Sequence, residues 1–135
     1  MASHDAKVVA ANVLKGNVER PNYVGVPSIA FTIPPLARVG LLEQEARREN
    51  LRFRVQHEKT SEWYTARRVS EDCAGFKVLV EDGTDRLLGA HLIGPHADEV
   101  INIFGLAIRT GLTVEQVKAA IFGYPTAASD IHYML

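Results

Sequence analysis

The fold of this chain is decided by one stretch, which reads Leu88-Gly89-Ala90-His91-Leu92-Ile93-Gly94-Pro95-His96-Ala97-Asp98-Glu99-Val100-Ile101-Asn102. Residues 86–93 are apolar on both faces, which predicts a strand at the centre of a sheet. Pro95 suits the first turn of a helix, and Asp98 and Glu99 lie near the positive end of its dipole. Residues 100–108 are apolar almost all round. We therefore expect the sheet to bury one face of this helix, and a helix or a second subunit to bury the other.

Three further strands are expected before this stretch. Residues 76–81 form a hairpin with residues 86–93, because the connection Asp82-Gly83-Thr84-Asp85 is a strong turn signal. Apolar and polar residues alternate over residues 28–33, which predicts a strand, and this strand should end at Pro34-Pro35. Residues 51–57 alternate most clearly and predict a half-buried strand. The polar, aperiodic residues 59–73 predict a loop or an irregular strand.

Two more helices complete the main body of the predicted fold. Residues 41–49 should form a surface helix with a Glu43/Arg47 pair one turn apart. After Gly111, Thr113 and Gln116 form a capping box, and the inner face of that helix is assigned to Val117, Ala120 and Ile121. The predicted class is α+β, a mostly antiparallel sheet with two helices packed on one face.

The N-terminal region has a different character. Residues 6–14 predict a short helix that ends at Gly16, and residues 16–27 are rich in Gly, Pro and Asn, as in a linker. Because a helix this short is not stable alone in water, it needs a packing surface that the chain itself does not obviously contain. We expect it to lie outside the main body.

Composition excludes several classes of protein and site. A net charge of −1 gives no general reason to expect nucleic acid or an anionic membrane as partner. Cys73 is the only cysteine, so an intrachain disulfide, a redox dithiol and a zinc knuckle are excluded. No apolar run approaches the roughly 18 residues that span a membrane, and no secretory leader is apparent. We expect a cytoplasmic protein. No metal site is predicted, since the histidines lack a ligand spacing.

The tail reads Gly123-Tyr124-Pro125-Thr126-Ala127-Ala128-Ser129-Asp130, followed by Ile131-His132-Tyr133-Met134-Leu135. By itself it predicts a turn and a short amphipathic helix. A Ser/His/Asp set is conceivable from Ser129, His132 and Asp130, but Ser129 does not lie on a nucleophile elbow. A hydroxyl that caps the last helix is the expected role of Ser129. No self-contained active site is visible.

Several segments together resemble the C-terminal interface domain of the pyridine nucleotide-disulfide oxidoreductases, the family of glutathione reductase, dihydrolipoamide dehydrogenase and mercuric reductase. The resemblance covers residues 24–135 and rests on residues 26–40, residues 75–80, residues 88–102 and the Tyr-Pro-Thr step of the tail. Residues 1–23 resemble the last helix of the family's FAD domain with a linker. The resemblance implies a parent enzyme with FAD and NAD(P) domains and a homodimer built through this domain. It also implies no bound cofactor and no activity for this part alone.

In the family, the tail carries a His-Pro-Thr motif with a Glu five residues after the His, an acid–base pair beside the partner's flavin. Here the His position falls on Tyr124 and the Glu position on Ser129, with Asp130 next. The resemblance places Tyr124 and Pro125 near the partner's FAD. A phenol, with an ordinary pKa of about 10, is a poor base at neutral pH but donates a proton or a hydrogen bond.

The alternative for Tyr124 is a packing residue that only shapes the pocket. Ser129 cannot stabilise a positive base as a carboxylate does, and Asp130 substitutes only if the helix register shifts by one. The family's motif proline follows a cis peptide, so a cis bond is predicted at Tyr124-Pro125.

The favoured function is therefore the dimerisation domain of an FAD- and NAD(P)-dependent disulfide oxidoreductase, which supplies its tail to the partner subunit's active site. The alternative is a self-contained small α+β module that binds a ligand on its sheet face or its tail. A hydrolase built on Ser129 and His132 is the third reading. A C2 dimer would favour the first, and a monomer with a ligand-sized pocket the second.

Overall fold

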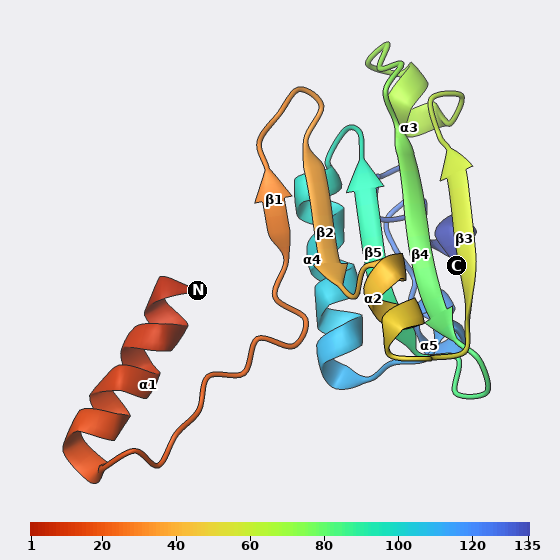
Figure 1. The fold of residues 1–135 in the computed structure, drawn as a ribbon. Coiled ribbons are helices and arrows are strands. Elements are labelled where there is room, and N and C mark those ends of the chain that lie inside the picture. The colour runs from red at the N-terminus through yellow and green to blue at the C-terminus, as the bar shows by residue number, and fades with distance from the viewer.

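The computed structural model describes residues 1–135 and is built on one five-stranded sheet (Figure 1). The strand order is β1-β2-β5-β4-β3, and every neighbouring pair is antiparallel. The strands are β1 Ser28–Ala30, β2 Leu36–Gly40, β3 Phe53–Lys59, β4 Gly75–Glu81 and β5 Leu87–Ile93. The α+β class, the β4–β5 hairpin and the central place of β5 are confirmed.

The chain forms six helices, of which α1 lies away from the sheet. They are α1 Ala2–Lys15, α2 Glu43–Arg48, α3 Tyr64–Arg67, α4 Ala97–Thr110, α5 Val114–Lys118 and α6 Ile131–Met134. Helix α4 packs across β2 and β5, and α5 and α6 lie on the same side (Figure 1). Two helices on one face are thus confirmed. The short α2 lies on the opposite face.

The hydrophobic core lies between the sheet and α4. Phe104 and Ile101 of α4 are fully buried against Val39, Val78 and Val80 of the sheet. Burying one large apolar side chain contributes about 1.5–3 kcal/mol. The C-terminal residues close the same core, because α6 contributes a fully buried isoleucine.

The first hairpin differs from the prediction. The strand expected over residues 28–33 ends at Ala30, and β2, which was not predicted, follows directly after Pro34-Pro35. Prolines remove backbone donors from the ladder, but here they lie in the turn between two antiparallel strands. The apolar side chains of Phe31 and Ile33 therefore project from the hairpin tip and are 81% and 100% exposed.

The strand predicted over residues 51–57 is present as β3, but its predicted half-burial was wrong. Strand β3 begins at Phe53 and is the edge of the sheet, and no helix covers Val55 or His57, which are exposed. The alternation described a strand without saying which neighbours it has. The region expected to be a loop contains α3, whose four residues are too few to show a helical period.

One prediction about helix burial fails, because α5 ends at Lys118 and leaves Ala120 and Ile121 exposed instead of lining the core. Helix α4 buries one face on the sheet, as predicted, and a stripe that includes Asn102 and Leu106 faces away from it. The burial of this second face by a helix or a second subunit stays a prediction. Helix α4 is capped by Gly111 in the left-handed conformation, and the predicted capping box of α5 is confirmed.

Helix α1 lies away from the main body, as predicted (Figure 1). Of its 14 residues only Val8 is buried. The linker then packs on α4, where Gly25 lies against Gly105. A Cβ added to Gly105 would lie 2.8 Å from the Gly25 carbonyl oxygen, so the two backbones touch without a side chain between them. Arg109 donates a hydrogen bond of 2.9 Å to the Val24 carbonyl oxygen. No helix is both long and apolar enough to cross a bilayer.

Candidate functional site

Of the tail residues singled out in the sequence, Tyr124 and Pro125 are exposed, and Ser129 and Asp130 are half-buried. Tyr124 is 82% exposed, and its hydroxyl has no hydrogen-bond partner within the chain. The Tyr124-Pro125 peptide is cis, which confirms the prediction. The end of the tail is anchored, because Ile131 and Leu135 are buried in the core. A free aromatic side chain thus projects from a fixed segment.

Ser129 is used to build the turn after Pro125. Its Oγ donates to the Thr126 carbonyl oxygen at 2.6 Å and accepts from the Thr126 amide at 3.2 Å. Thr126 Oγ1 in turn donates to the Gly123 carbonyl oxygen at 2.6 Å. The expectation that Ser129 caps the last helix was wrong, because the N-cap of α6 is Asp130, without a side-chain cap bond, and the Ser129 hydroxyl serves the turn before it. Ser129 forms no hydrogen bond with His132, so the Ser/His pair that a hydrolase needs is not assembled.

Asp130 connects the tail to α3. Its half-buried carboxylate accepts a hydrogen bond from Thr65 Oγ1, 65 positions away in the sequence. Burial raises the pKa of Asp130, and the hydrogen bond from Thr65 partly offsets this rise. No Lys or Arg is paired with this carboxylate.

A groove of about 460 Å³, here called the tail groove, runs between the tail and α3. It is lined by Glu58, Trp63, Tyr64, Thr65, Tyr124, Pro125, Ser129, Asp130 and Tyr133. All four tail residues singled out in the sequence line it together. The sequence analysis missed the other five. The signal that was available is the chain's only tryptophan, which stands in an otherwise polar stretch.

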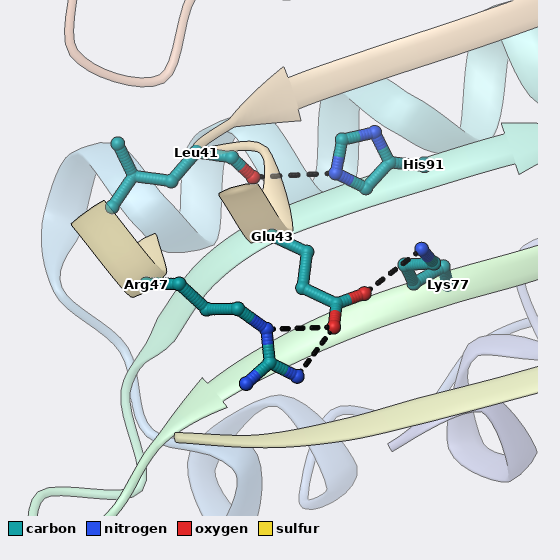
Figure 2. A network of polar contacts seen from close by, with 5 residues as sticks. All are labelled: Leu41, Glu43, Arg47, Lys77 and His91. Carbon is teal, nitrogen blue, oxygen red and sulfur yellow. Dashed lines mark hydrogen bonds and ion pairs between the residues drawn. The ribbon is translucent and has the colours of Figure 1, made fainter. Parts of the chain in front are cut away.

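The opposite face of the sheet carries a polar network, here called the α2 clamp (Figure 2). Glu43 of α2 accepts hydrogen bonds from Arg47 at 2.6 Å and from Lys77 of β4 at 3.0 Å. The hydrogen bonds from Arg47 and then Lys77 hold the pKa of Glu43 below its ordinary value. His91 of β5 donates to the Leu41 carbonyl oxygen at 3.2 Å, and burial lowers its pKa. These groups fasten α2 to the sheet, which accounts for their charges without a ligand.

The sequence profile of the pyridine nucleotide-disulphide oxidoreductase dimerisation domain matches residues 26–135. The chain belongs to this family. A protein of Staphylococcus aureus described as an uncharacterized 19.7 kDa protein in a mercuric resistance operon is 47% identical over the whole chain, which covers 75% of that protein. A dihydrolipoyl dehydrogenase of the same species is 35% identical over 93% of the chain. The chain spans only 26% of that enzyme.

Solved structures agree with this interface-domain assignment. The flavoprotein disulfide reductase RclA of Escherichia coli superposes with a TM-score of 0.85 at 28% identity, over 98% of this chain and 30% of the reductase. A NAD-dependent persulfide reductase from A. fulgidus superposes with a TM-score of 0.77 at 20% identity, a likeness of fold alone. The chain is thus a dimerisation domain with the fold that such reductases carry.

Proposed function

We propose that this dimerisation domain forms a homodimer and presents its tail to the active site of an FAD- and NAD(P)-dependent disulfide oxidoreductase. The observation that carries the proposal is the exposed Tyr124 at the family's His position. Its turn is fixed by Thr126 and Ser129, and the helix that follows is anchored by the buried side chain of Ile131. A surface aromatic ring without an internal partner, on a segment held from both sides, suits contact with a second molecule.

The dimer surface is assigned to the outer stripe of α4. Leu106 is 60% exposed although both flanking residues of the helix are buried, and Asn102 lies one turn before it. In a C2 dimer this stripe contacts the same stripe of the partner, so Leu106 of both subunits would lie at the contact. The proposed domain division places residues 1–23 with the flavin-binding part and residues 24–135 with the dimer. It is supported by the separation of α1 from the sheet.

The tail would form one wall of the partner's flavin site. Tyr124 and Pro125 fit this place because both are exposed and line the open tail groove. FAD would supply electron exchange with a dithiol. Tyr124 would donate a hydrogen bond or a proton to a thiolate at this wall, and Ser129 would hold the turn that aims it. Asp130 accepts a hydrogen bond from Thr65, which supports a role in fixing the tail rather than in orienting Tyr124.

The dimer is tested on the 135-residue chain by light scattering. We expect a dimer for the wild type and a monomer for Leu106→Asp, because a charge at the two-fold contact is desolvated without a partner. Glu115→Gln, an exposed change on α5, serves as control. A monomeric wild type at high concentration would contradict the assignment. In the flavin-containing enzyme, unchanged disulfide reduction by Tyr124→Phe would reject the proton-donor role.

A ligand-binding module is the second candidate, because the tail groove is formed within a single chain. A monomer that binds a small molecule in this groove would favour it. We also propose a cytoplasmic location, supported by one exposed cysteine with no disulfide partner. The operon named for the S. aureus relative concerns mercury. The family description, which names a disulphide oxidoreductase, supports a disulfide as the substrate class.

A further inference from the structure

The lining of the tail groove has an unusual chemical bias. It combines four aromatic side chains with two carboxylates and no cationic residue. The rings are Trp63, Tyr64, Tyr124 and Tyr133, and the carboxylates are Glu58 and Asp130. The three other lining residues are uncharged. Aromatic faces carry negative electrostatic potential, so rings and carboxylates attract the same kind of group.

The aromatic wall is held in place before any ligand arrives. The Trp63 indole donates a hydrogen bond of 3.3 Å to Glu58. Its ring meets Tyr133 edge to face, with centroids 6.0 Å apart, and it packs on Phe76 at 5.8 Å. Because three neighbours restrain the indole, little conformational entropy remains to be lost on binding.

Asp130 supplies an incompletely compensated charge to the same groove. Its carboxylate is half-buried and receives one hydrogen bond, from the neutral hydroxyl of Thr65. No Lys or Arg forms an ion pair with this carboxylate, and burial raises its pKa because the ionised form is poorly solvated there. A cation placed beside it would recover part of the lost solvation energy.

We propose that the tail groove binds an organic cation, an ammonium or guanidinium group, against the rings of Trp63 and Tyr133 with Asp130 as counter-ion. A volume of about 460 Å³ accommodates such a group with a short alkyl chain. This inference deepens the proposed function and rests on it: in a disulfide oxidoreductase, the cation bound in the groove would be part of the substrate. The disulfide substrate would carry a positively charged arm.

The opposite charge is disfavoured by the same residues. An anionic ligand would bring its carboxylate near Glu58 and Asp130, and like charges repel in a site that is partly shielded from water. The groove therefore discriminates by repulsion as well as by attraction. We expect cationic ligands to bind and anionic ligands of similar length to be rejected.

Trp63 makes the test direct, because it is the only tryptophan and it lines the groove. The purified chain is titrated with agmatine, spermidine and tetramethylammonium at constant ionic strength, and its fluorescence is recorded. Butanediol and glutarate are the neutral and anionic comparators. We expect a saturable change with the cations and none with the comparators.

Two isosteric variants and one matched control locate the site. Asp130→Asn and Glu58→Gln keep the hydrogen-bond acceptors for Thr65 and Trp63 but remove the charge. Each should weaken cation binding by about tenfold, which corresponds to about 1.4 kcal/mol. Glu62→Gln removes an adjacent exposed charge that does not line the groove and should change nothing. Circular dichroism checks the fold, and the exposed Glu58 provides the test if the Asp130 variant is unfolded.

Three results would overturn the proposal. They are no saturable binding of any cation by fluorescence and calorimetry, an equal response to glutarate, and an equal loss in Glu62→Gln. Light scattering on the same samples separates this inference from the proposed function. A dimer that binds no cation rejects only the ligand class. A monomer that binds cations rejects the proposed dimer but supports the cation site in the tail groove.

Discussion

The helices on the two faces of the sheet are held by different kinds of interaction. On one face, α4 packs apolar side chains such as Phe104 into the strands, and water is excluded over the length of the helix. On the other face, α2 has one fully buried residue, Ala46, and is fastened by the α2 clamp. The first face should be insensitive to pH and salt, and the second should respond to both.

The difference separates what forms the fold from what adjusts it. Burial energy grows with apolar area, and α4 contributes five residues to the hydrophobic core, including Phe104 and Ile101. Partly exposed ion pairs each add little, so α2 can loosen without loss of the sheet. Each prediction below tests one side of this contrast, beginning with the largest effect.

Phe104→Ala should lower the free energy of unfolding by about 3–5 kcal/mol, because it leaves a cavity between α4 and the sheet. Urea denaturation measures the loss. Leu106→Ala, two residues away on the exposed stripe, should change the stability of the monomer by less than about 0.5 kcal/mol. Similar losses in both variants would show that α4 is not packed as described.

Gly89→Ala should cost about 1–3 kcal/mol, because the added Cβ overlaps the Leu41 carbonyl oxygen where the chain crosses to α2. Both atoms belong to rigid backbone, so no side chain can move aside. Gly83→Ala is the matched control for space, since nothing lies near its Cβ, although its positive φ adds strain of its own. Thermal unfolding compares the two. A Gly89 variant as stable as the wild type would show that this crossing yields easily.

Lys77→Met should cost only about 0–1 kcal/mol, because Lys77 is 38% exposed and its pair with Glu43 is screened by water. The loss should shrink further in 1 M salt. Urea denaturation at low and high salt measures both values. A large, salt-independent loss would mean that the clamp is a structural element equal to the core.

Acid should weaken the α2 face first. Hydrogen bonds from Arg47 and Lys77 lower the folded-state pKa of Glu43, so the unfolded chain takes up the proton at higher pH than the folded chain. Stability therefore falls as pH drops from the ordinary glutamate value through the lowered one. His91, whose pKa is lowered chiefly by burial, has the same sign at higher pH.

Glu43→Gln isolates the carboxylate. The variant should show a flatter loss of stability below about pH 4.3, the ordinary pKa of a glutamate, and the same slope as wild type near pH 6. Thermal melts at a series of pH values measure this difference. Parallel curves throughout the acid range would contradict the role of the clamp.

Removal of residues 1–15 should have the smallest effect, within about 0.5 kcal/mol, because α1 has one buried side chain and lies away from the sheet. Denaturation of the shortened chain tests this. A loss of several kcal/mol would show that α1 belongs to the main body.

The elements of the fold could be predicted from the sequence where several local signals agree with one another. The turn Asp82–Asp85 joins two strands with suitable apolar patterns, and α4 has an acidic first turn and ends at Gly111. Strand β2 was not predicted, because two prolines in a row, Pro34 and Pro35, indicate the end of a strand as readily as the tip of a hairpin. The edge position of β3 depends on strand order, which a local pattern does not contain.

The candidate site could be predicted only in part. Tyr124, Pro125, Ser129 and Asp130 came from the tail and its resemblance, and the structure places them around one groove. The opposite wall comes from residues 58–65, some 60 positions away in the sequence. No spacing rule connects two such segments, because the antiparallel sheet and α3 bring them together. The catalytic roles of Tyr124, Ser129 and Asp130, and the place of Pro125 near the partner's FAD, stay predictions.

The contact between Gly25 and Gly105 has a mechanical consequence. With two backbones in direct contact, no side chain can change rotamer to absorb a displacement. A pull on the linker would shift the axis of α4 itself, and the Arg109 hydrogen bond would carry part of the load. In the proposed dimer, motion of the segment before residue 24 would therefore change the alignment of the two α4 helices across the two-fold axis.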